Sequence, residues 1–136
     1  MIESLLNYNI LGIGLALIML IIGSVTDIWK REIHDYYWII FGSVGFLLVF
    51  INSDILPYLL NIGIALIIAP FVIFIWRIGL FGGADAFALI ALAVIAPMAT
   101  FSENPVTPFT SLSNAAILFI IPFCVNILRN VISIVK

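Results

Sequence analysis

Long apolar runs separated by short polar segments cover almost the whole chain. Their lengths approach or reach the about 20 residues that a membrane-crossing helix needs, and they span residues 9–26, 36–51, 55–76, 85–101 and 111–135. In each of the last three, a proline is expected to kink or interrupt the helix: Pro70, Pro97 and Pro122. Gly12, Gly14 and Gly23 could let a neighbouring helix approach the first run closely. The pattern predicts an all-α, polytopic transmembrane bundle of about five spans.

The composition indicates that the predicted bundle forms a single integral membrane domain over residues 1–136. The chain is 65% hydrophobic and 9% charged, so little of it is left for a soluble domain. The net charge of −2, without a basic run, gives no reason to expect nucleic acid as a partner. One cysteine, Cys124, and one histidine, His34, cannot by themselves form a disulfide or a histidine-based metal site. We therefore expect the lipid bilayer as surroundings, and neither a cofactor nor a metal.

The basic residues predict the orientation. If the N-terminus lies outside, the cytoplasmic segments contain all five of them: Lys30, Arg31, Arg77, Arg129 and Lys136. The outer segments then hold acidic residues only, namely Glu3, Asp54 and Glu103. The positive-inside rule favours this arrangement, which predicts a multi-pass protein of the cytoplasmic membrane. The aromatic residues that open the second run, Tyr36, Tyr37 and Trp38, are of the kind found at headgroup level.

Two aspartates stand at span ends on the same predicted, cytoplasmic side. Asp27 follows the first span, and Asp85 opens the fourth after a loop that contains Gly79, Gly82 and Gly83. Such glycines allow a tight bend and the close approach of another backbone or a substrate. A carboxylate beside hydrocarbon is costly and marks a candidate functional site. Whether the first and fourth spans touch does not follow from the sequence.

Two aspartates that share a water molecule can hydrolyse a peptide bond, one ionised and acting as base, the other protonated and acting as acid. Each aspartate also has a simpler interpretation. Asp85 could be the N-cap of its helix, and Asp27 could be a solvated loop charge beside Lys30 and Arg31. The shared side and the glycine loop favour the catalytic interpretation of the pair.

The short segment after Asp27 holds further candidates. Glu32 and Asp35 could attract a basic substrate segment, or could simply neutralise Lys30 and Arg31. Lys30 is a third candidate substrate contact. His34 could act as a base, although a loop histidine near headgroups is more often without such a role.

Both aspartate neighbourhoods resemble those of the type IV prepilin peptidase and preflagellin (prearchaellin) peptidase family, which are membrane aspartyl proteases of the GxGD type. The first motif is Asp27-Ile28-Trp29-Lys30-Arg31-Glu32-Ile33-His34-Asp35, and the second is Gly82-Gly83-Ala84-Asp85. The resemblance covers roughly residues 12–101. It implies an aspartic-type endopeptidase that removes the short basic leader, a class III signal peptide, from pilin-like or archaellin-like precursors at the cytoplasmic membrane face.

In this resemblance Asp27 and Asp85 are the catalytic pair, and Gly82, Gly83 and Ala84 shape the site. The basic residues of the leader would suit Glu32 and Asp35. The chain departs from the family pattern at two places: His34 stands where proline is common, and Phe87 stands where a lysine often follows the second aspartate. Alternatives are a non-enzymatic or catalytically dead membrane scaffold of a pilus or secretion system, and an ion-coupled transporter.

Overall fold

The computed structural model describes residues 2–51, 55–80, 82–98 and 104–135, and within these the regular structure is helical. The elements are α1 (Ile2–Lys30), α2 (Asp35–Leu48), a 3-10 turn η1 (Val49–Ile51), α3 (Ile55–Ala65), α4 (Ile68–Arg77), α5 (Gly83–Ile95) and α6 (Thr107–Val135). The all-α prediction is confirmed. The end of the expected fourth span at Phe101, and the outer acids Asp54 and Glu103, lie outside the described residues.

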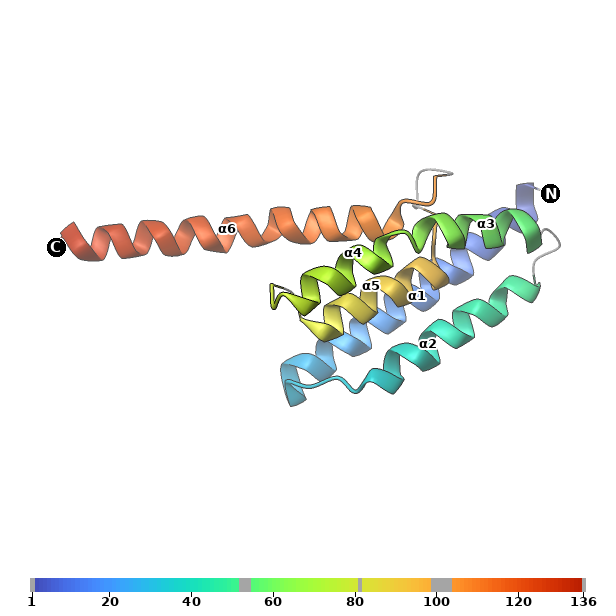
Figure 1. The fold of residues 1–136 in the computed structure, drawn as a ribbon, viewed down its shortest axis with the longest axis horizontal. Coiled ribbons are helices and arrows are strands. Elements are labelled where there is room, and N and C mark those ends of the chain that lie inside the picture. The colour runs from blue at the N-terminus through green and yellow to red at the C-terminus, as the bar shows by residue number, and fades with distance from the viewer. Residues whose placement is uncertain (1, 52–54, 81, 99–103, 136) are drawn as a thin grey trace.

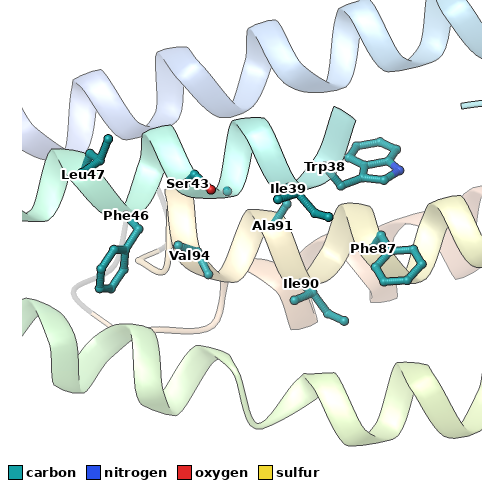
Figure 2. A pocket seen from close by; sticks show the side chains of 10 residues that line it. Trp38, Ile39, Ser43, Phe46, Leu47, Phe87, Ile90, Ala91 and Val94 are labelled. Carbon is teal, nitrogen blue, oxygen red and sulfur yellow. The ribbon is translucent and has the colours of Figure 1, made fainter. Parts of the chain in front are cut away.

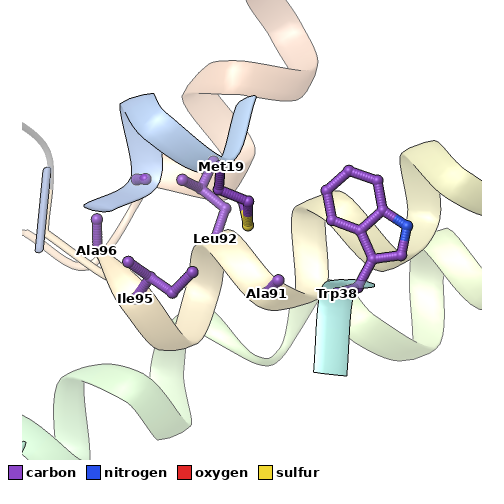
Figure 3. Close-up of a cluster of buried hydrophobic side chains, with 7 residues drawn as sticks. Met19, Trp38, Ala91, Leu92, Ile95 and Ala96 are labelled. Carbon is purple, nitrogen blue, oxygen red and sulfur yellow. The ribbon is translucent and has the colours of Figure 1, made fainter. Parts of the chain in front are cut away.

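Helix α5 lies at the centre of the bundle, and α1, α2, α3, α4 and α6 all contact it (Figure 1). Its 13 residues include six that are buried: Ala86, Leu89, Ala91, Leu92, Ala93 and Ile95. Figure 3 shows Ala91, Leu92 and Ile95 of α5 in one cluster with Met19 of α1 and Trp38 of α2. The small alanines allow several helices to pack around one axis at close range.

Glycines permit the closest of these approaches. A Cβ atom at Gly12 of α1 would lie 2.6 Å from the carbonyl oxygen of Ile95, and one at Gly45 of α2 would lie 2.5 Å from the Cγ1 atom of Ile95. Gly23 packs against the Trp38 ring, with 3.3 Å between the position of its missing Cβ and the ring. The prediction of a close helix approach is confirmed at Gly12 and Gly23, but it is wrong for Gly14, whose Cβ position has no atom within 4 Å.

All the expected apolar segments contain helix, but their lengths differ from the prediction. Three helical segments are long enough to cross a membrane, at residues 9–30, 55–77 and 107–133, whereas the apolar helices at 35–51 and 83–95 are shorter. The α3–α4 segment turns at Leu66 and Ile67, about one helical turn before Pro70. Helix α5 ends at Ile95, because the residue before Pro97 is disfavoured in the α conformation.

Helix α6 stands apart from this pattern. It begins at Thr107, earlier than expected, and continues through Pro122 to Val135. Its first turns pack near α5, and the rest extends beyond the bundle (Figure 1). Pro108 near its start is buried, but its most apolar 18-residue stretch has no buried residue. The surface of α6 is therefore available to lipid or to other protein.

Candidate active site

Asp27 lies in the last turn of α1. The helix does not stop at Thr26 as expected but continues to Lys30, because nothing in the Asp27–Lys30 segment breaks it. It ends where Arg31 adopts a left-handed conformation with φ of 55°, and the Arg31 N–H donates to the Asp27 carbonyl oxygen at 2.8 Å. Asp27 therefore lies on a helix and not in a loop. Its side chain projects from a helix end and is exposed.

Asp85 is positioned by a turn that needs glycine. Helix α4 ends in a Schellman motif, in which Gly79 has φ of 77°, its N–H donates to the Trp76 carbonyl, and the Leu80 N–H donates to the Ile75 carbonyl. The chain then reverses, and α5 begins at Gly83 with Gly82 as its N-cap. Asp85 stands in the first turn of α5. The interpretation of Asp85 as the N-cap is therefore wrong, because Gly82 occupies that position.

Gly82 also makes room for the Asp85 carboxylate. A Cβ atom at Gly82 would lie 2.8 Å from Asp85 Oδ2, which is too close for any larger residue unless the carboxylate moves. Gly83 is packed in a similar way, since its Cβ would lie 3.1 Å from Nε1 of Trp76. Ala84 packs against the central apolar cluster. The glycine-rich segment thus fixes where the Asp85 side chain lies.

The two aspartates lie at the same end of the bundle. This end holds the C-terminus of α1 and the N-terminus of α5, which run alongside each other in the bundle (Figure 1). Asp27 is near enough for its negative charge to act on the Asp85 carboxyl group. Both side chains are exposed, and no hydrogen bond joins these two described residues. Water and an extended peptide can therefore reach both carboxyl groups.

Two aromatic residues, Trp76 and Phe87, pack around the start of α5, which carries Asp85. The Trp76 ring packs on Gly83, and its centroid lies 5.7 Å from that of Phe87. The guanidinium of Arg77 lies 5.7 Å from the centroid of the Trp76 ring, within reach of a cation–π interaction. The only sequence signal for this arrangement was the position of Trp76 directly before the glycine loop.

The aromatic residues at the start of α2 divide between surface and interior. Tyr36 is exposed, as expected for a headgroup position, but Trp38 is only 5% exposed and belongs to the core. Tyr37 is partly buried, and its hydroxyl donates to the Met19 carbonyl oxygen at 2.6 Å. Helical spacing explains why Trp38 is buried while Tyr36 is exposed. Trp38 lies on the same face of the helix as Gly45 and Val49, and this face is buried.

The charged candidates lie in the α1–α2 connection, near the same end of the bundle. Glu32 Oε1 lies 3.9 Å from Nδ1 of His34, and the His34 ring stacks on Tyr36 with 5.2 Å between centroids. Lys30 is the last residue of α1, and Asp35 is the first of α2. Among these described side chains, neither Glu32 nor Asp35 forms an ion pair with Lys30 or with the adjacent arginine. The interpretation of Glu32 and Asp35 as neutralising partners therefore has no support in the structure.

In the described part of the chain, no three His, Cys, Asp or Glu side chains gather closely enough to hold a metal ion. Two carboxyl groups that water can reach allow general acid–base hydrolysis.

Comparison with known protein families decides the family. The model of the type IV leader peptidase family matches residues 14–128, a stretch that includes both aspartates. The chain belongs to the type IV leader peptidase family. The resemblance noted from the two motifs is confirmed, and the chain is a membrane protein of a peptidase family that acts on pilin-type precursors in general. No curated protein and no solved structure matches the chain significantly.

Proposed function

We propose that this type IV leader peptidase is an aspartic endopeptidase whose catalytic pair is Asp27 and Asp85. The observation that carries the proposal is that residues far apart in the sequence bring two exposed carboxyl groups to one end of the bundle, one in the last turn of α1 and the other in the first turn of α5. Both residues lie within the stretch that matches the family.

In the proposed reaction, one carboxylate removes a proton from a water molecule, whose oxygen attacks the carbonyl carbon of the scissile peptide bond. The other carboxyl group is protonated and donates its proton to the carbonyl oxygen, which gives a tetrahedral diol. Collapse of the diol breaks the C–N bond, and the nitrogen leaves with a proton from the dyad. Nearby like charges favour a pair that holds one proton between them, so the two groups titrate as a unit.

The substrates in this proposal are pilin-like or archaellin-like precursors with a short basic leader. All five basic residues fall on the side of the predicted topology that holds the two aspartates, which supports a site on the cytoplasmic face and an N-terminus outside. The packing of α1 to α6 around α5 supports one peptidase domain over the chain. Glu32 and Asp35, which are not paired with Lys30 or Arg31, would receive the basic leader.

The test is a cleavage assay in detergent with precursors that carry a basic leader followed by an apolar segment. Asp27→Asn and Asp85→Asn are compared with the unchanged protein, and Asp54→Asn, in the predicted outer turn, is the matched control. We expect Asp27→Asn and Asp85→Asn each to abolish cleavage while the proteins remain folded, as judged by thermal unfolding. Cleavage that persists in both variants would overturn the dyad. An unchanged protein that cleaves none of the precursors would contradict the proposed function.

A further inference from the structure

A groove of about 510 Å³ runs along the contact between α2 and α5 on one side of the bundle. Figure 2 shows its walls, with side chains of α2 along one wall and side chains of α5 along the other. The residues that matter for the argument are Trp38, Gly42 and Phe46 on α2 and Phe87, Ala91 and Val94 on α5. With the exception of Ser43, the groove is lined by apolar side chains and glycine.

One end of this groove, the α2–α5 groove, lies beside the proposed active site. It runs along α5 from Val94 to Phe87, and Phe87 lies in the turn of α5 that follows Asp85. On the other wall it ends at Trp38, in the first turn of α2, just after Asp35. The groove therefore leads from the interior of the apolar layer to the aspartates and to Glu32 and Asp35 of the α1–α2 connection.

We propose that the α2–α5 groove binds the apolar helix of the precursor, with the scissile bond at the Asp27–Asp85 end. This inference rests on the proposed function and adds the place where the substrate binds. Its shape and chemistry suit a helix in a membrane, because Gly42, whose Cβ position has no atom within 4 Å, leaves room for the backbone of a partner helix to approach. The stretch of α5 from Phe87 to Val94 corresponds to about two turns of a helix packed alongside it.

Charge gives the substrate a direction in the groove. A precursor whose apolar helix lies along the α2–α5 groove would emerge at its Trp38–Phe87 end. The segment that emerges there meets Glu32 and Asp35, neither of which forms an ion pair with Lys30 or Arg31. A basic leader complements this end, whereas a lipid acyl chain carries no charge that would exploit it.

The first test fills the groove with a side chain. Gly42 lines the α2–α5 groove, and its Cβ position has no atom within 4 Å, so Gly42→Leu fits the fold while it occupies the groove. Gly63→Leu on α3 is the matched control, because Gly63 also has no atom within 4 Å and does not line the groove. We expect Gly42→Leu to raise KM for a precursor by about tenfold, the effect of losing one well-packed contact, and to change kcat little. Gly63→Leu should leave both unchanged.

The second test detects the substrate directly and does not need cleavage. In a Cys124→Ser background with Asp85→Asn, Ser43→Cys places a thiol in the α2–α5 groove, and Gly63→Cys places one outside it. The probe is a precursor with a single cysteine in its apolar segment, supplied under mild oxidation. A disulfide that forms with Ser43→Cys and not with Gly63→Cys supports the docking site.

The outcomes separate this inference from the proposed function. An unchanged KM in folded Gly42→Leu, or equal cross-linking at both positions, overturns the docking site and would leave the groove to lipid, even if the dyad cleaves. Cross-linking at Ser43→Cys, together with no cleavage of any precursor by the protein that retains both Asp27 and Asp85, would support the docking site and overturn the proposed function.

Discussion

The two aspartates reach the same end of the molecule by different means. Asp85 stands in the first turn of a short central helix, where Gly82 and the ring of Trp76 on Gly83 define the space around it. Asp27 stands near the end of a 29-residue helix, and its position follows from how far that helix runs before Arg31 stops it. The comparison indicates that packing fixes one carboxylate, whereas helix length places the other.

Removal of either carboxylate tests whether the two aspartates, although held in place differently, contribute equally to peptide-bond cleavage. If both groups transfer protons, Asp27→Asn and Asp85→Asn should each lower kcat by about 10³-fold or more, although only Asp85 is packed in place. The measurement is single-turnover cleavage of a precursor at saturating enzyme. A large loss of kcat in Asp85→Asn with nearly full activity in Asp27→Asn would exclude a mechanism that uses both aspartates.

Because Asp85 is packed in place, a single methyl group added next to its carboxylate should lower kcat. In Gly82→Ala the new Cβ would lie 2.8 Å from Asp85 Oδ2, so the carboxylate must turn away. Because displacement of a catalytic group by about 1 Å can cost about 10²-fold, we expect a fall in kcat of about that size. Thermal unfolding should change little, since the moving atoms are at the end of a side chain. Gly63→Ala is the control, and equal kcat values for the two variants would contradict the packing argument.

The acidic residues of the α1–α2 connection should affect substrate binding and leave the chemical step unchanged. Glu32→Gln combined with Asp35→Asn should raise KM for a basic leader by about fivefold at low salt, since exposed charge pairs contribute about 1 kcal/mol or less. High salt should reduce this difference by screening. The matched substrate is a precursor with the leader lysines and arginines replaced by glutamine. A rise in KM of the same size for that substrate would show that charge is not the cause.

The smallest effect is expected where α1 ends. Arg31 has φ of 55°, a conformation that glycine adopts without strain, so Arg31→Gly should increase the free energy of unfolding by about 0.5–1 kcal/mol. Arg31→Lys keeps both the charge and the strain and serves as the control. A decrease in the free energy of unfolding for Arg31→Gly would mean that the arginine side chain supports the end of α1.

Much of the candidate site could be found in the sequence because its signals are local. An aspartate at the end of an apolar run, and another after clustered glycines, are visible without coordinates, and basic residues indicate which ends share a side. The roles of Trp76 and Phe87 could not be found in this way. They follow from the fold of the α4–α5 turn, which places Trp76 on Gly83 and within 5.7 Å of Phe87, measured between ring centroids.

The sequence by itself determined the helical class and the places where helices can occur, since apolar runs in lipid must satisfy their own backbone hydrogen bonds. Pro97 indicated an interruption of the fourth apolar run, and α5 ends at Ile95, two residues before it. Only the tertiary structure decided that α5 lies at the centre, that Trp38 is buried while Tyr36 is not, and that a groove runs between α2 and α5. The reason is that an apolar face can pack equally well against lipid or protein, and only the arrangement of all the helices determines which of the two it meets.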